Sequence, residues 1–402
     1  MFLRMRGRIL LGLVVLVAAA IGLNYLRPVP AVAATSSVVS QKIIAGSAPS
    51  LPWPSTGSAA VGVSGLGKLA DSGNENQIPT ASVAKVMTAL VVMHDKPLGL
   101  GQTGPSITVT DEDVQAYQAD LEQKQSVVAV QAGEVLTQYQ ALQAMLIPSG
   151  NNIAELLARW DAGSVAAFID RMNARARSLG LAKSKFADPA GADSATVSTA
   201  SDLLALAMVA MADPVIAQIV SLPQVKLPVA GVEFNVNAAL GQDGIVGIKT
   251  GSGLAEGANF LFAATVTVTG HQLTIFGCVM GQPTLEKAFS AARALIRAIQ
   301  PALVVKQELA RNQAVGGYDT PWGAHSDVIS SVDVPLVEWP GMVLRERLDA
   351  RPLNIDRPVN PGTLAGAVHV ALGDYELDVP VVTAGQLYPP GRFWRLTRLP
   401  NL

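Results

Sequence analysis

The stretch FLFAATVTV, Phe260–Val268, is followed after a short turn at Thr269-Gly270 by a second apolar stretch, LTIFGCVM, Leu273–Met280. Each has the length of a strand and is far shorter than the roughly 20 residues that a membrane-spanning helix needs. Two short apolar runs joined by a turn, rich in β-branched and aromatic residues, are typical of a hairpin of buried strands. The interior of the chain therefore predicts a packed sheet rather than repeated membrane spans.

The composition fits one large domain or two ordinary ones in a chain of 402 residues. Half of the residues are hydrophobic and only 15% are charged, against about 25% in typical soluble domains. This excludes a disordered chain. The net charge of −2 provides no basic excess to neutralise phosphates, which argues against a nucleic-acid binder.

The N-terminus carries an export signal. An uninterrupted apolar run, Ile9–Leu23, follows three arginines within the first eight residues, and small residues at Ala31-Val32-Ala33 offer a cleavage site. The run is long for the core of a cleaved signal and short for a spanning helix. Residues 1–34 are therefore expected to be either a signal peptide or an N-terminal membrane anchor, and the sequence leaves both open.

Outward from the hairpin, the pattern predicts a sheet with a block of helices inserted into it. Residues 35–56 are rich in Ser, Ala and Pro and are expected to form an extended linker. Strands are expected over Ala59–Val63, Lys68–Ser72 and Ile245–Ile248. Helices are expected from Thr80, as N-cap, to Met93, and over Thr137–Met145, Asn152–Trp160, Val165–Leu179, Ser201–Ala212 and Leu285–Ile299. After Pro301, short valine- and leucine-rich pieces predict a small all-β domain.

Metal and cofactor chemistry is not expected. Cys278 is the only cysteine and lies in a predicted buried strand, so it is interpreted as a core residue. The four histidines are scattered, without the spacing of a metal site. We therefore predict no metal and no cofactor.

Three short motifs follow one another along the chain: Ser82-Val83-Ala84-Lys85, Ser149-Gly150-Asn151 and Lys249-Thr250-Gly251. Near the start of a helix, Ser82 and Lys85 lie one turn apart on the same face. A serine hydroxyl needs a base to accept its proton, and a lysine can serve if burial and a second cation lower its pKa. Lys249 can be that cation. The helix N-terminus also provides N–H groups for an oxyanion.

The other two motifs supply the remaining parts of an acyl-transfer site. Ser149 can relay a proton to a leaving amine, and Asn151 can hold a substrate peptide group. Lys249 and Thr250 can bind a carboxylate, while Gly251 allows close approach of the backbone. The backbone N–H groups of Ser82 and Ser252 are expected to form the oxyanion hole. The set predicts an enzyme that recognises a free C-terminal carboxylate.

The chain resembles the D-alanyl-D-alanine carboxypeptidases, which are low-molecular-mass penicillin-binding proteins with SxxK, SxN and KTG motifs. The resemblance covers nearly all of the chain after the linker and is looser in the C-terminal part. The similar segments are Pro79–Ala89, Gly133–Thr137, Leu146–Asn152, Met172–Ala176, Leu179–Leu181, Asp188–Gly191, Val197–Ala200, Phe234–Asn237, Asp243–Gly251, Gly362–Gly366 and Pro380–Gly385.

The resemblance implies an α+β fold: a β-lactamase/transpeptidase-like domain, with an antiparallel sheet, helices and an inserted helical subdomain, followed by a small all-β domain. The boundaries expected are 57–301 for a serine DD-peptidase catalytic domain and 302–402 for the C-terminal β-rich domain. It implies a serine-type D-Ala-D-Ala carboxypeptidase that trims peptidoglycan stem peptides and binds β-lactams. Such an enzyme is exported and acts at the outer face of the cytoplasmic membrane, in the cell wall or in the periplasm, with the membrane as a partner if the N-terminal segment is uncleaved.

By the same resemblance, Ser82 is the acyl-ester nucleophile, Lys85 the proton acceptor and Ser149 the proton relay, while Asn151, Lys249, Thr250, Gly251 and Ser252 bind substrate. Two features depart from the family pattern. Relatives often have a threonine and a paired Ala-Gly soon after KTG, whereas Ser252-Gly253-Leu254-Ala255-Glu256-Gly257 stands here. Many relatives end in an amphipathic membrane helix, whereas this chain reaches Leu402 soon after Arg392-Phe393-Trp394-Arg395, so an anchor is expected at the N-terminus.

Three alternatives remain open on the sequence. A DD-endopeptidase uses equivalent chemistry on cross-linked peptides. A β-lactamase of class A relies on a glutamate for deacylation, and the segment Asp188–Ala200 contains none. A non-catalytic penicillin sensor or wall-binding protein would keep the cleft without turnover, against which the intact Ser82, Lys85, Ser149 and Lys249 argue.

Overall fold

The computed structural model describes residues 2–253 and 257–398. These fall into two compact units. The larger unit is Ser47–Val304, and the β-rich unit combines Met1–Gly46 with Val305–Leu402. The chain thus begins in the unit in which it also ends.

The larger unit is built on a five-stranded antiparallel sheet with the order β11-β12-β13-β3-β4. The predicted hairpin is confirmed, because β12 and β13 pair from Val268↔His271 onward. The predicted flanking strands are confirmed as well. The strands are β3 (Ser58–Val63), β4 (Gly67–Asp71), β11 (Ile245–Gly253), β12 (Gly257–Val268) and β13 (His271–Gln282).

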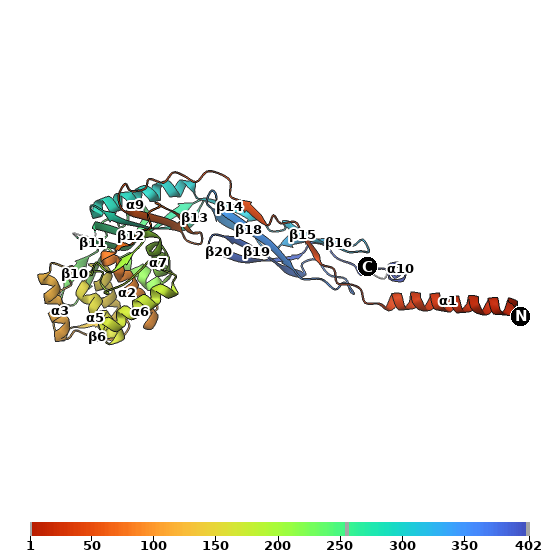
Figure 1. Ribbon diagram of the computed structural model, residues 1–402, viewed down its shortest axis with the longest axis horizontal. Coiled ribbons are helices and arrows are strands. Elements are labelled where there is room, and N and C mark those ends of the chain that lie inside the picture. The colour runs from red at the N-terminus through yellow and green to blue at the C-terminus, as the bar shows by residue number, and fades with distance from the viewer. Residues whose placement is uncertain (1, 254–256, 399–402) are drawn as a thin grey trace. The chain divides into compact units, whose positions relative to one another are not determined.

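Helix α9 (Leu285–Ile299) covers one face of this sheet and the helical block covers the other (Figure 1). Five of the expected helices are present within two residues of their predicted ends, whereas the helix expected from Thr80 begins only at Lys85, after a 3₁₀ turn. The block consists of the helices α2 (Lys85–Asp95), α3 (Asp111–Glu122), α4 (Gln138–Leu146), α5 (Asn151–Ala162), α6 (Val165–Ser178), α7 (Ala200–Ala212) and α8 (Pro214–Val220). Short 3₁₀ turns lie around the block and the sheet, namely η1 (Ala81–Ala84), η2 (Gln242–Gly244) and η3 (Gln300–Ala302). Three two-stranded pairs complete the unit, namely β5 (Ile78–Pro79) with β8 (Val197–Ser198), β6 (Ser106–Thr108) with β7 (Val135–Thr137), and β9 (Gln224–Leu227) with β10 (Gly231–Phe234).

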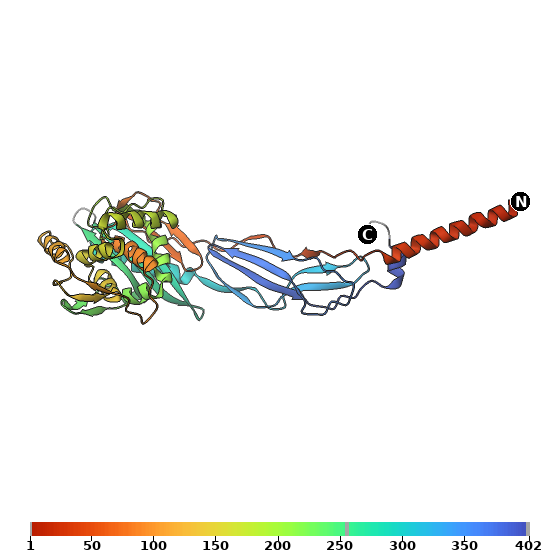
Figure 2. The same cartoon turned by 90° about the horizontal axis from the view of Figure 1, so that it is seen from below.

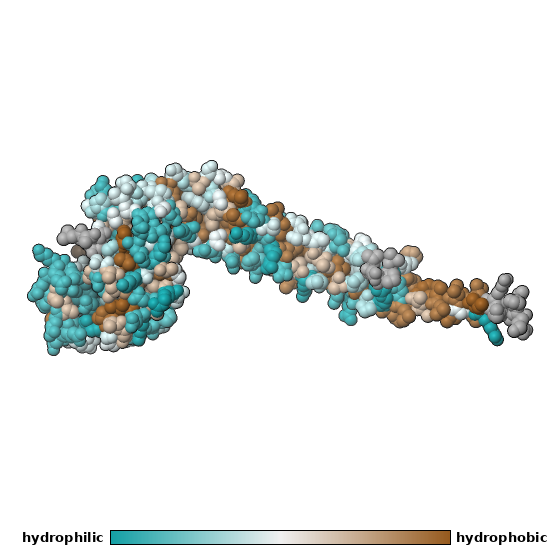
Figure 3. Space-filling view, viewed as in Figure 1, coloured by the Kyte–Doolittle hydropathy of each residue, from teal (hydrophilic) through white to brown (hydrophobic). Residues whose placement is uncertain are grey.

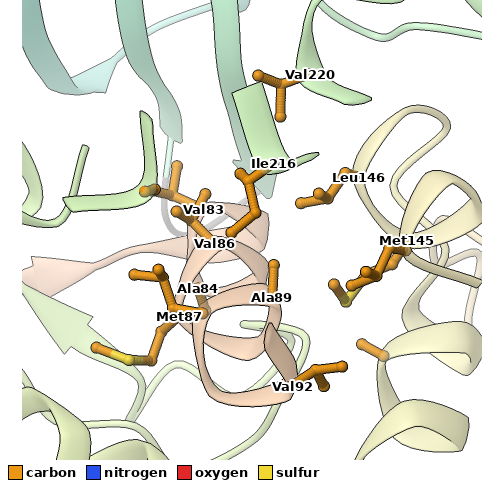
Figure 4. Packing of buried hydrophobic residues seen from close by; sticks show 14 of the residues in the cluster. Val83, Ala84, Val86, Met87, Ala89, Val92, Met145, Leu146, Ile216 and Val220 are labelled. Carbon is orange, nitrogen blue, oxygen red and sulfur yellow. The ribbon is translucent and has the colours of Figure 1, made fainter. Parts of the chain in front are cut away.

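The core of the larger unit surrounds α2. Every residue of α2 from Lys85 to Met93 is buried, as expected for a helix that is apolar on all sides. Val86 and Ala89 lie on the side of α2 that faces α4 and α8, from which Met145 and Ile216 point toward them (Figure 4). Burial of each large aliphatic side chain contributes about 1.5–3 kcal/mol. The residue at the start of this helix is thereby held at a fixed position.

The β-rich unit contains a seven-stranded antiparallel sheet with the order β1-β15-β16-β20-β19-β18-β2 (Figure 2). The composition favoured an extended linker over residues 35–56. The two edge strands of the sheet come from this part of the chain: β2 lies inside the segment, and β1 begins one residue before it. The strands are β1 (Ala34–Ser36), β2 (Gln41–Ile43), β15 (Ala314–Asp319), β16 (His325–Ser330), β18 (Val343–Ala350), β19 (Leu364–Leu372) and β20 (Tyr375–Thr383), with the separate pair β14 (Val304–Leu309) and β17 (Val334–Glu338).

The described residues contain one straight helix, α1 (Phe2–Leu26), that is long and apolar enough to cross a membrane. Its stretch Arg8–Leu26 has a mean hydropathy of 2.5 and is not buried by the rest of the chain, so that it forms a continuous apolar surface (Figure 3). The pair α7 and α8 is also apolar, but it is bent by 105°. Because its side chains belong to the core of the larger unit, we assign α7 and α8 to that core.

Candidate active site

Ser82 lies in a 3₁₀ turn rather than in the α-helix that the sequence predicted. The turn η1 precedes α2, and Thr80 adopts an αR conformation and makes no side-chain cap. Instead, its hydroxyl donates to the carbonyl of Ala81 at 3.1 Å. The expected N-cap at Thr80 is therefore wrong. A 3₁₀ turn has three residues per turn, so side chains at i and i+3 eclipse, which places Lys85 directly over Ser82.

Lys85 is fully buried and its amino group has three acceptors. Nζ donates to Ser82 Oγ at 2.7 Å, to Asn151 Oδ1 at 2.5 Å and to the Ala190 carbonyl at 3.0 Å. Burial lowers the pKa of Lys85 well below its usual value of 10.5, and the nearby positive charge of Lys249 lowers it further. The neutral amine is therefore easier to reach than on an exposed lysine, and it can take a proton from the hydroxyl it contacts.

Two carboxylates oppose this shift in the pKa of Lys85. Asp188 and Asp120 each favour the charged lysine, with effects smaller than those of burial and of Lys249. Asp120 is itself buried, and its pKa is raised to about 6, first by burial and then by the charge of Glu155. With a pKa of about 6, Asp120 is mostly ionised at pH 7, so its carboxylate favours the charged form of Lys85.

Asn151 begins α5 and is held by the loop that follows α3. Its backbone N–H donates to the Ser126 carbonyl at 2.8 Å, and its Nδ2 donates to Gln125 Oε1. Asn152 exchanges two further hydrogen bonds with the backbone of Val128, at 2.9 and 3.0 Å. Gln125 therefore fixes the orientation of the Asn151 amide, so that Oδ1 faces Lys85.

The sequence did not single out Gln125. The loop that carries it has no motif of its own, and its position beside Asn151 depends on a turn at Lys124, where φ is +57°. Nothing in the sequence indicated this turn, because the residue in the left-handed conformation is a lysine and not a glycine.

Ser149 occupies a left-handed conformation between α4 and α5, with φ of +72°. Only 3% of its surface is exposed. A non-glycine residue in this conformation costs roughly 1–3 kcal/mol and is held there by its surroundings. The serine therefore sits two residues before Asn151 in a constrained position, beneath the surface rather than on it.

The KTG motif lies on β11, next to the turn η1 that carries Ser82. Lys249 and Thr250 are 2% and 3% exposed, and Lys249 Nζ donates to the Thr250 carbonyl at 3.1 Å. Burial lowers the pKa of Lys249 from 10.5 to about 7. A side chain at Gly251 would place its Cβ 2.7 Å from the Thr80 carbonyl oxygen and 3.1 Å from the Ser82 nitrogen. Glycine is required here because strand and turn touch through their backbones.

Two further residues that the sequence did not identify as functional position the turn that carries Ser82. Asn259 is fully buried on β12, donates to the carbonyls of Pro79 and Thr80 at 3.1 and 3.0 Å, and accepts from Gly281 N at 2.9 Å. Gly191 has φ of +76°, and a Cβ on it would lie 1.8 Å from the carbonyl oxygen of Ala81. The turn is thus fixed from the sheet on one side and from the loop of Gly191 on the other.

A cleft of about 510 Å³ opens above Ser82. Of the predicted site residues, Ser82, Asn151 and Ser252 line it, together with Ala81, Gln123, Lys124, Gln125, Ser126, Gly191, Ala192 and Gly253. Lys85, Ser149, Lys249 and Thr250 are buried and are absent from its lining. The expected departure after KTG begins at Ser252 and Gly253, and its residues Leu254–Glu256 lie outside the described residues.

A family model described as D-alanyl-D-alanine carboxypeptidase matches residues 61–284, more than half of the chain. The protein belongs to this family. The matched range contains all three motifs and also Asn259 and Gly191, the residues that position the turn of Ser82. The resemblance seen in the sequence is confirmed.

Individual relatives carry both carboxypeptidase and endopeptidase names. A D-alanyl-D-alanine carboxypeptidase from Mycobacterium tuberculosis is 34% identical over 197 residues, which are 46% of this chain and 62% of that protein. A D-alanyl-D-alanine endopeptidase from Pseudomonas aeruginosa is 32% identical over 171 residues, 42% of this chain and 52% of that protein. The chain thus aligns with about half to three fifths of the length of these relatives.

Solved structures confirm the predicted α+β fold. A DD-transpeptidase from Streptomyces is similar with a TM-score of 0.54 and 25% identity, over 63% of this chain and 98% of that one. A D-alanyl-D-alanine carboxypeptidase from Francisella tularensis is similar with a TM-score of 0.60 over 86% of this chain and 96% of that one. At 20% identity, the second similarity concerns the fold alone.

Proposed function

We propose that the protein is a serine-type D-Ala-D-Ala carboxypeptidase, which removes the terminal D-Ala from peptidoglycan stem peptides and is acylated by β-lactams. The observation that carries the proposal is the 2.7 Å contact between Lys85 Nζ and Ser82 Oγ, made by a fully buried lysine at the base of an open cleft. Family membership and the relatives named as carboxypeptidases support it.

In the proposed acylation, neutral Lys85 accepts the proton of Ser82 as Oγ attacks the carbonyl carbon of the penultimate D-Ala. The negative charge that develops on the carbonyl oxygen faces the backbone N–H groups of Ser82 and Ser252. The bond to the terminal D-Ala then breaks, and its amine leaves with a proton passed from Lys85 through Ser149. Water hydrolyses the resulting ester on Ser82.

Substrate binding is assigned to both walls of the cleft. Asn151 is one of the polar groups on the wall formed by the helical block, and Ser252 lies on the wall formed by β11. Lys249, Thr250 and Gly251 are proposed to receive the substrate carboxylate. Because the pKa of Lys249 lies at about 7, a bound carboxylate would favour its charged form and gain a strong partner.

The test is release of D-Ala from a diacyl-L-Lys-D-Ala-D-Ala peptide by the full chain, together with covalent labelling by a fluorescent penicillin. Ser82→Ala is expected to abolish both, and mass spectrometry is expected to place the label on Ser82. Ser221→Ala, which changes an exposed serine outside the site, serves as the matched control and is expected to retain both. Labelling of Ser82→Ala at the wild-type rate would show that the nucleophile is assigned wrongly.

DD-endopeptidase activity is the second candidate function, because relatives from Pseudomonas aeruginosa and Escherichia coli, each 32% identical, carry that name. Incubation with a cross-linked muropeptide dimer separates the two. Carboxypeptidase action on pentapeptide monomers yields free D-Ala, whereas endopeptidase action converts the dimer into monomers. Faster turnover of the dimer than of the monomer would assign the protein as an endopeptidase.

A further inference from the structure

The C-terminal end of α1 and the short helix α10 (Arg392–Thr397) cap one another's backbone carbonyls. Asn24 Nδ2 donates to the carbonyls of Leu396 and Arg398, both at 3.0 Å. In return, the guanidinium of Arg398 donates to the carbonyls of Asn24 and Pro28 at 3.0 Å and to that of Arg27. The last carbonyls of a helix lack partners within it and carry partial negative charge, so a guanidinium is a favourable cap.

The residues that follow α1 are also built into the β-rich unit. Val32 is buried and exchanges two backbone hydrogen bonds with Leu353, both at 2.9 Å. Ala34 begins strand β1 of the large sheet. The predicted cleavage site, Ala31-Val32-Ala33, therefore lies inside folded structure. Cleavage after Ala33 would remove the partners of Arg398 and one half of the pairing with Leu353.

Aromatic side chains gather around α10. The rings of Trp322 and Trp394 meet edge to face with centroids 5.1 Å apart, and Trp322 Nε1 donates to the Tyr388 carbonyl at 2.9 Å. Phe393 and Tyr388 are 80% and 59% exposed. Rings with a polar edge and an apolar body concentrate at the level of lipid headgroups.

Arg392 and Arg395 add positive charge to the same surface, and Arg392 is exposed. We call the set Trp322, Tyr388, Arg392, Phe393, Trp394 and Arg395 the α10 platform; it contains no acidic residue. The apolar stretch Arg8–Leu26 has 19 residues, which at 1.5 Å per residue span about 28 Å, close to the ~30 Å hydrocarbon thickness of a bilayer. Because α10 is hydrogen-bonded to the C-terminal end of that stretch (Figures 1 and 2), a bilayer spanned by α1 would have the platform at the level of its headgroups.

We propose that the N-terminal segment is retained in the mature protein and that the α10 platform rests on an anionic phospholipid bilayer that α1 spans. The arginines would pair with lipid phosphates, and the aromatic rings would insert at the headgroup boundary. Three arginines in the first eight residues favour an orientation with the N-terminus in the cytoplasm. This proposal does not depend on the proposed enzymatic function.

The first test determines the N-terminus of the full-length gene product made in an exporting bacterium. The expected result is a protein that stays with the membrane after an alkaline carbonate wash and whose intact mass includes residues 1–33. A protein whose mass begins at Ala34 would overturn the proposal, since the caps of Arg398 would then be absent from the mature chain.

The second test places the full chain in vesicles that contain brominated lipids, which quench tryptophan fluorescence on contact. Two of the five tryptophans belong to the platform, so a loss of up to two fifths of the emission is expected in anionic vesicles. The double variant Arg392→Glu/Arg395→Glu is expected to lose most of this quenching. The control Arg345→Glu/Arg347→Glu, which changes two exposed arginines of β18, should quench as wild type does.

Each remaining outcome of the second test counts against the platform. Equal quenching of Arg392→Glu/Arg395→Glu and wild type would show that these arginines do not hold the surface on the bilayer. Quenching that is absent from the wild type in anionic vesicles would show that α10 does not lie at the membrane at all.

Discussion

Gly191→Ala tests how closely the loop of Gly191 determines the position of Ser82. Gly191 has φ of +76°, and the new Cβ would lie 1.8 Å from the Ala81 carbonyl oxygen, whereas real Cβ contacts essentially never fall below 3.0 Å. Loop and turn must therefore separate by about 1.2 Å. Neither segment can move easily, because Lys85 Nζ donates to the Ala190 carbonyl and the Thr88 hydroxyl donates to the Pro189 carbonyl at 2.6 Å.

The expected effect has two parts that can be separated. The left-handed conformation costs an alanine about 1–2 kcal/mol, and relief of the overlap costs a further ~1–3 kcal/mol. Because Ala81 immediately precedes Ser82, a displacement near 1 Å is expected to slow acylation about 100-fold. Gly180→Ala is the matched control, since Gly180 has φ of +72° with open space around its Cβ.

The assay combines urea unfolding with the rate of labelling by a fluorescent penicillin. Gly180→Ala should lose about 1–2 kcal/mol of unfolding free energy and label at the wild-type rate. Gly191→Ala should lose more stability and label about 100-fold more slowly, with mass spectrometry confirming the site of the label. Equal labelling rates for the two variants would refute the idea that this loop positions Ser82.

Three further substitutions test individual contacts. Lys249→Met should abolish D-Ala release. It should nevertheless raise the unfolding free energy at pH 7 by up to about 5 kcal/mol, because burial lowers the pKa of the lysine from 10.5 to about 7 and each pKa unit is worth ~1.4 kcal/mol. Between pH 7 and 10.5 the unfolded chain binds a proton that the folded chain does not. The unfolding free energy of the wild type should therefore rise from pH 7 to pH 10, and its difference from that of Lys249→Met should shrink. Unfolding free energies that change with pH in the same way in both proteins would contradict this. Gln125→Ala should slow acylation about tenfold through loss of one hydrogen bond worth ~1–1.5 kcal/mol, whereas Gln123→Ala, in the same cleft, should not; equal rates would exclude a positioning role for Gln125. Asn259→Ala should lower the unfolding free energy by about 2–5 kcal/mol, because two buried carbonyls and one N–H lose their partner, and a change in urea midpoint too small to measure would count against it.

Much of the fold follows from local pattern. The hairpin of β12 and β13, the helix α9 and the order of strands and helices depend on periodicity and on turn residues close in sequence, so they could be predicted. The 3₁₀ turn at Ser82 could not. Its conformation is set by contacts with Asn259 and Gly191, which lie more than 100 residues away, and the propensity of the segment for α-helix gave no sign of them.

The candidate site divides in the same way. The amino-acid sequence by itself predicted which side chains belong to it, because a serine, a lysine one turn away and two polar motifs form a recognisable chemical set. Only the tertiary structure decided how they are used: that Lys85 is buried beside Lys249, that Gln125 orients Asn151, and that the cleft exposes Ser82 while covering Lys85. The pKa of a lysine depends on the water and charge around it, and these are supplied by elements distant in the chain. The same holds at the N-terminus, where the sequence left signal and anchor open and the caps between α1 and α10 favour the anchor.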